Sequence, residues 1–159
     1  MTRVTRVLVA VIGSSSCSAE VAAWAETVGR LLAERGAVLL CGGLGGVMEA
    51  AARGAKQRGG LTVGILPGAD PGEANPYIDV PLATGMGEMR NALIVRAAQA
   101  AIAIGGGWGT LSEIAMAQRI KTPVVGLHDA FPAAIDIPRV SSPEAAVAWA
   151  LEQAARPEV

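Results

Sequence analysis

Four glycines stand in one short turn, between an apolar run at 100–104 and a segment from Thr110 that has the composition of a helix. Each glycine loses more backbone entropy on folding than another residue would, so four in one turn indicate close approach of backbone N–H groups to a ligand. The free amides and the dipole at a helix N-terminus favour an anion. We therefore expect a bound phosphate, held by Gly106, Gly107, Gly109 and Thr110.

Glu113 and Arg90 are the charged residues that could act on a ligand at this turn. The Glu113 carboxylate would lie within reach of a ribose whose phosphate rests on the turn. The alternative is a capping box, in which Thr110 is the N-cap and Glu113 only accepts a bond from a backbone amide. Arg90, in the preceding segment, could assist phosphate binding or be an ordinary solvated side chain, for which Arg96 serves as the comparison.

Two further loops of small residues also follow apolar runs. The first begins Gly13-Ser-Ser-Ser16 and the second is Gly42-Gly-Leu-Gly-Gly46. No dinucleotide fingerprint or P-loop occurs, which disfavours NAD and nucleoside triphosphate hydrolysis. For 42–46 a tight strand-to-helix connection explains the glycines as well as ligand contact does. The ligand contacts that we expect from the two loops are Gly13, Ser14, Ser15, Gly42, Gly43 and Gly45.

The elements that must position these residues alternate along the chain. Apolar runs predict strands at 4–12, 37–41, 61–66, 100–104 and 123–127, with short strands around Ile78 and Val140. Helical spacing and end signals predict helices at 18–35, 47–58, 87–98, 110–119 and 143–155. In the third of these, Met89, Leu93 and 95–97 should face inward. Alternation of this kind predicts an α/β fold, a Rossmann-like doubly wound parallel sheet in three α/β/α layers, with all three loops at one edge.

Composition narrows the function further. The chain has 159 residues, 52% hydrophobic and 17% charged, which suits one domain over 1–159. A net charge of −1 gives no footprint for nucleic acid or anionic membrane, so the expected partner is a small phosphate-bearing molecule. The apolar runs are too short for a signal peptide or a membrane span, and we expect a cytoplasmic protein. Cys17, Cys41 and the lone His128 form no metal pattern, so neither a metal nor a cofactor is expected.

Together these motifs resemble the LOG family, also labelled lysine decarboxylase-like, within the Rossmann-like nucleotide-binding domains. The family pattern M-x-x-R-K corresponds to the stretch from Met86, through Arg90, to Asn91, and P-G-G-x-G-T-x-x-E corresponds to Gly105 through Glu113. The loops at 13–16 and 42–48 match G-S-S and G-G-x-x-G-x-M. Gly105 replaces a proline and Asn91 a lysine, and these departures look closer to a short bacterial branch similar to molybdenum cofactor carrier proteins.

The resemblance implies two functions that share a phosphate site. One is a phosphoribohydrolase that cleaves the N-glycosidic bond of a nucleoside 5′-monophosphate, with Arg90 and Glu113 engaging the ribose and the attacking water. Its oxocarbenium-like transition state would be stabilised by a fixed carboxylate. The other is a non-catalytic carrier of a phosphorylated pterin such as molybdenum cofactor. The resemblance also implies a homodimer or a dimer of dimers packed through helices beside the site, to which Trp24, Trp108 and Trp149 could contribute apolar surface.

Overall fold

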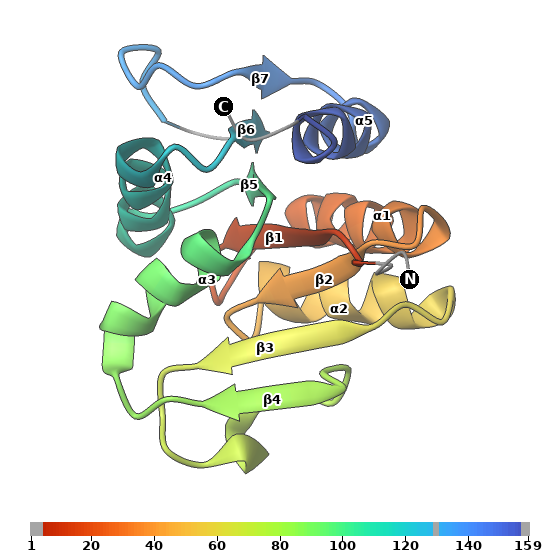
Figure 1. Cartoon of the computed structure of the whole chain (residues 1–159), viewed down its shortest axis with the longest axis vertical. Coiled ribbons are helices and arrows are strands. Elements are labelled where there is room, and N and C mark those ends of the chain that lie inside the picture. The colour runs from red at the N-terminus through yellow and green to blue at the C-terminus, as the bar shows by residue number, and fades with distance from the viewer. Residues whose placement is uncertain (1–4, 129–130, 157–159) are drawn as a thin grey trace.

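One parallel sheet runs through the molecule. The computed structural model describes residues 5–128 and 131–156. All the strand pairs of the sheet are parallel, and the strand order is β4-β3-β2-β1-β5-β6-β7 (Figure 1). The strands are β1 (Leu8–Gly13), β2 (Val38–Cys41), β3 (Thr62–Leu66), β4 (Val80–Ala83), β5 (Ala100–Ile104), β6 (Val124–Leu127) and β7 (Arg139–Val140). The predicted doubly wound parallel α/β fold is therefore confirmed.

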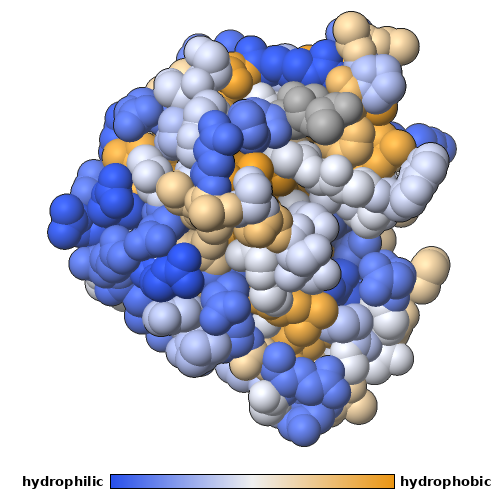
Figure 2. Space-filling model, turned by 180° about the vertical axis from the view of Figure 1, so that it is seen from behind, coloured by the Kyte–Doolittle hydropathy of each residue, from blue (hydrophilic) through white to orange (hydrophobic). Residues whose placement is uncertain are grey.

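Helices cover both faces of this sheet. Figure 1 shows α1, α2 and α5 on one side and α3 and α4 on the other. Their bounds are α1 (Ala19–Glu34), α2 (Val47–Gln57), α3 (Asn91–Ala97), α4 (Trp108–Ile120) and α5 (Pro143–Ala154), and two short 3₁₀ segments are η1 (Pro71–Glu73) and η2 (Gly87–Arg90). Figure 2 shows that the surface seen from behind is mostly hydrophilic, with small scattered hydrophobic areas.

The alternation of side chains along the strands divides the core into two layers. In β1, Val9 and Val11 pack with α1, α2 and α5, whereas Ala10 and Ile12 pack with α3 and α4. Successive residues of a strand point to opposite faces, so a strand covered on both sides must be apolar at every position. All five residues of β5 are buried accordingly. This is why continuous apolar runs located the central strands.

α1 and α2 approach each other closely through glycines. A Cβ built on Gly54 of α2 would lie 1.9 Å from the Glu26 carbonyl oxygen, and one built on Gly29 of α1 would lie 1.9 Å from the Ala51 carbonyl oxygen. Any side chain at either position would force the two helices apart. The close contact fixes the position of α2 relative to α1, and with it the end of the 42–46 loop, which leads directly into α2.

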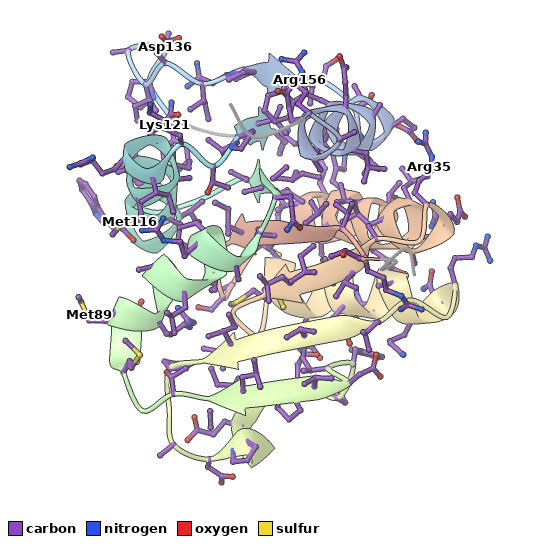
Figure 3. The ribbon with its side chains drawn as sticks, viewed as in Figure 1. Arg35, Met89, Met116, Lys121, Asp136 and Arg156 are labelled. Atoms are coloured by element: carbon purple, nitrogen blue, oxygen red, sulfur yellow. The ribbon has the colours of Figure 1, made fainter. Side chains whose placement is uncertain are left out.

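The segment expected to form one helix at 87–98 is instead divided in two. Its first part is the 3₁₀ segment η2, and α3 begins only at Asn91. A 3₁₀ turn has about three residues rather than 3.6, so it shifts which side chains face the interior. Arg90 is buried as a result, whereas Met89 is 70% exposed and Leu93 is also exposed, so their predicted inward orientation is wrong. Figure 3 shows Met89 pointing away from the body of the molecule.

The short strand predicted around Ile78 begins later than expected. Ile78 lies in a turn, where its amide donates to the Asn75 carbonyl at 3.2 Å, and β4 begins at Val80. β4 and the two-residue β7 are the edges of the sheet, and β4 contains Pro81. The strand expected near Val140 is β7.

Candidate functional site

A cleft of about 200 Å³ lies at the carboxyl edge of the sheet, beside the boundary between β1 and β5. The strand order reverses at this boundary, since β2 to β4 extend to one side of β1 and β5 to β7 to the other. Ligands of doubly wound folds bind at such a position. Four segments line the cleft: the loop after β1, the loop after β2 with the start of α2, the η2–α3 segment, and the turn after β5 with the start of α4.

The turn after β5 leaves the N-terminus of α4 uncapped. Gly105 and Gly106 have φ of 58° and 137°, and they turn the chain so that α4 begins at Trp108. The N-cap is therefore Gly107, with no side-chain capping bond, and Thr110 is the third helical residue rather than the predicted N-cap. The first amide to bond back is that of Leu111, which donates to the Gly107 carbonyl at 2.9 Å. The amides of residues 108–110 precede that bond and can donate to a ligand.

Glu113 does not form a capping box, because its helix starts too early for it to reach the N-cap. It lies in the first half of α4, lines the cleft and is only 7% exposed. Its Oε2 atom is buried and has no hydrogen-bond partner within residues 5–128 and 131–156. Burial raises the pKa of this carboxyl to about 8, helped by Glu88 and opposed by the positive charge of Arg90. At neutral pH the side chain is therefore mostly a neutral acid.

Arg90 is held inside the cleft wall rather than in solvent. It is 5% exposed, and its Nη1 donates to the Asn91 side-chain oxygen. Its Nε is buried and has no partner in the described part of the chain. Gly42 makes room for the guanidinium, because a Cβ there would lie 2.9 Å from Arg90 Nη2. Arg96, in the same segment, is exposed. The comparison separates the two arginines, and the solvated-side-chain alternative is wrong for Arg90.

The cleft gathers most of the residues that the motifs selected. Those lining it are Gly13, Ser14, Ser15, Gly42, Arg90, Gly107, Gly109, Thr110 and Glu113. Gly43, Gly45 and Gly106 are not among the described residues that line the cleft. Gly43 packs on Leu66, Gly45 lies against the Ser15 carbonyl, and Gly106 lies against the Phe131 ring. Structural constraints of the loops account for these three.

Motif analysis did not select every residue of the cleft wall. The others that line it include Leu44, Met48, Glu88, Asn91, Ile94 and Trp108. Met48 and Asn91 lie within the motifs that match the family pattern, so the sequence could have pointed to them as cleft residues. Trp108 occupies the variable position of its motif, and only its place within the glycine turn pointed to the cleft.

Neither cysteine is placed as a metal ligand. Burial raises the pKa of Cys41 to about 11, which keeps it a thiol, and Cys17 is exposed. Within 5–128 and 131–156, no cluster of three or more His, Cys, Asp or Glu side chains could hold a metal ion. In the same part of the chain, no helix has both the length and the apolar character to cross a membrane.

Comparison with known proteins agrees with this architecture. The model of the SLOG cluster4 family matches residues 6–155. An uncharacterized protein of Archaeoglobus fulgidus is 44% identical over 149 residues, which are 93% of this chain and 97% of the relative. The molybdenum cofactor binding protein of Rippkaea orientalis is 32% identical, with 94% and 98% of the two chains covered and a TM-score of 0.88. The molybdenum cofactor carrier protein of Chlamydomonas reinhardtii is 30% identical, with 96% and 100% covered and a TM-score of 0.88.

Proposed function

Since the chain belongs to the SLOG cluster4 family, we propose that it binds a phosphorylated pterin-type molecule in the cleft and carries it unchanged. The observation that carries the proposal is the uncapped start of α4, which faces a cleft that also contains a buried, incompletely paired arginine. The names of the two solved relatives, a molybdenum cofactor binding protein and a carrier, support the ligand class.

The phosphate would be recognised mainly by backbone groups. The amides of residues 108–110 and the Thr110 hydroxyl can donate to its oxygens, and the dipole of α4 favours its charge. Arg90 supplies the positive charge and the donor at Nε, which has no partner among the residues that the structure describes. Charge-assisted bonds of this kind are roughly twice as strong as neutral ones. Ser14 and Ser15 line the cleft from the loop after β1.

The protonation of Glu113 suits phosphate binding and disfavours one role in hydrolysis, that of a charged carboxylate beside the sugar. With a pKa of about 8, roughly one molecule in ten has this carboxyl ionised at pH 7. A neutral acid does not repel a phosphate and can donate its proton to a ligand oxygen. As a stabiliser of the positive charge that develops on the sugar, Glu113 would need the charged form. As a neutral acid it would instead suit protonation of the leaving base.

Hydrolysis of a nucleoside 5′-monophosphate is the second candidate. The observation in its favour is that Arg90 and Glu113 both line the cleft and both keep a buried polar atom without a partner. In that function they would contact the ribose and the attacking water. Release of free base from AMP, abolished by Glu113→Gln, would support this function instead.

The test is a titration with AMP and with 6-(phosphooxymethyl)pterin, followed by calorimetry and thermal unfolding. Either ligand at a hundredfold excess over its dissociation constant should stabilise the fold by about 2.7 kcal/mol. Arg90→Met should weaken binding strongly, and Arg96→Met, the matched control in the same segment, should bind as the wild type does. Failure of 6-(phosphooxymethyl)pterin to stabilise the wild type would contradict the proposal, and stabilisation by AMP alone would support the second candidate.

We further propose that the chain assembles as a homodimer or a dimer of dimers. Met89, Leu93 and Met116 are exposed on η2, α3 and α4, beside the cleft. Met89 and Met116 lie on the same side of the molecule in Figure 3. A second copy covering these helices would remove their apolar side chains from water.

A further inference from the structure

Trp108 is the first residue of α4, and among the described residues it is the most exposed large hydrophobic residue. It is 87% exposed and lines the cleft. Trp24 and Trp149, in contrast, are partly buried and pack against the core between the sheet and α1, α2 and α5. Core packing therefore explains those two tryptophans and does not explain Trp108.

The size of the cleft indicates where the rest of a ligand must lie. Sites for small molecules usually enclose about 300–1,000 Å³. A cleft of about 200 Å³ can hold the phosphate end of a nucleotide-sized ligand but not the whole of it. The remainder must extend over the rim.

Trp108 lies at the edge of the cleft, where the part of the ligand that the cleft cannot hold would leave it. Its backbone amide belongs to the proposed phosphate site, so its indole is attached to the same residue that would hold the phosphate. Leu44, which is half-buried, lines the cleft from the loop after β2. An apolar ring emerging from the cleft thus has an indole face available as a platform.

We propose that the Trp108 indole stacks on a flat heteroaromatic ring of the ligand whose phosphate binds at the start of α4. This inference rests on the proposed function and adds the chemical class of the other end of the ligand. Stacking on an aromatic side chain depends on the π-face and tolerates different ring systems. Trp108 would therefore select a ring-bearing phosphate over a ringless one, whether the ring is a purine or a pterin.

The experiment compares dissociation constants of three probes measured by calorimetry. AMP and 6-(phosphooxymethyl)pterin carry a ring, and ribose 5-phosphate has the phosphate without one. Trp108→Ala should weaken both ring-bearing probes roughly tenfold to a hundredfold and change ribose 5-phosphate less than twofold, because stacking is lost and the backbone amides remain. Trp108→Phe should retain most of the affinity. Leu82→Ala, which truncates an exposed apolar residue of β4 outside the cleft lining, is the control and should change none of the three.

The outcomes separate this inference from the proposed function. Equal weakening of all three probes by Trp108→Ala, or no weakening of the ring-bearing ones, overturns the stacking and leaves phosphate binding standing. Loss of a dimer in Trp108→Ala with unchanged affinities also overturns it, and assigns the indole to a contact between copies. Failure of the wild type to bind any probe refutes the phosphate site itself and the stacking with it.

Discussion

Replacing Glu113 with glutamine should stabilise the protein increasingly as the pH rises. The substitution keeps the size of the side chain and removes its ability to ionise. Glu113 is buried, its Oε2 has no partner, and its pKa is raised to about 8 from the ordinary 4.5. Burial is the main cause, Arg90 opposes it, and Glu88 adds to it.

The sign of the pH dependence follows from whether the folded or the unfolded chain holds the Glu113 proton. Below pH about 4.5 the carboxyl is protonated in both the folded and the unfolded chain, and Glu113 adds no pH dependence. Between about 4.5 and 8 only the folded chain keeps the proton, so the free energy of unfolding falls by about 1.4 kcal/mol per pH unit. The loss reaches about 3 kcal/mol at pH 7 and about 5 kcal/mol above pH 8. Glu113→Gln should lack this loss.

The assay is urea unfolding of both proteins at pH 4.5, 6, 7 and 8.5, at one protein concentration. The difference in unfolding free energy between variant and wild type should grow by about 3 kcal/mol from the lowest pH to pH 7. Thermal unfolding would show the same trend, at roughly 2–4 °C per kcal/mol for a chain of this size. Parallel pH profiles for the two proteins would refute the reasoning, since Glu113 would then ionise as it does in water.

Three further predictions concern the glycines and the assembly. Gly107→Val should fold normally, because a Cβ there meets no protein atom, but it should lose AMP binding in calorimetry, because the side chain would occupy the cleft. Gly106→Val should instead lower the melting temperature, because its Cβ would lie 2.7 Å from the Phe131 ring. Gly54→Ala should destabilise the fold by about 1–3 kcal/mol or more in urea unfolding, because its Cβ would lie 1.9 Å from the Glu26 carbonyl oxygen. Light scattering at micromolar concentration should give the mass of a dimer or tetramer, and a monomer alone would contradict the proposed assembly.

The sheet could be predicted from sequence because burial on both faces leaves a simple pattern. Runs such as that of β5 are apolar at every position, and glycine and serine loops follow them at the same edge. The loops after β1, β2 and β5 met in one cleft for that reason. Side-chain periodicity was less informative at η2, where a 3₁₀ turn changes the phase and brings Arg90 rather than Met89 inward.

The start of α4 shows why the sequence pattern placed the N-cap at the wrong residue, Thr110 instead of Gly107. Threonine and glycine are about equally good N-caps, and Thr110 with Glu113 has the spacing of a capping box, so the sequence favoured a helix start at Thr110. The positive φ angles of Gly105 and Gly106 turn the chain earlier, so the helix begins before that threonine. The burial of Glu113 follows from packing against segments far away in sequence, which no local spacing reveals.

The two edges of the sheet limit how copies of this chain can associate. An exposed strand with free amides invites another strand to pair with it. β7 offers only two residues, and β4 carries Pro81, whose nitrogen bears no hydrogen. The Thr84 amide donates to Leu66 on β3, and backbone groups alternate along a strand, so the Pro81 nitrogen faces the outer side. Growth of the sheet by strand addition is disfavoured at both ends, which protects the chain from fibrous aggregation and leaves the helical faces for any ordered assembly.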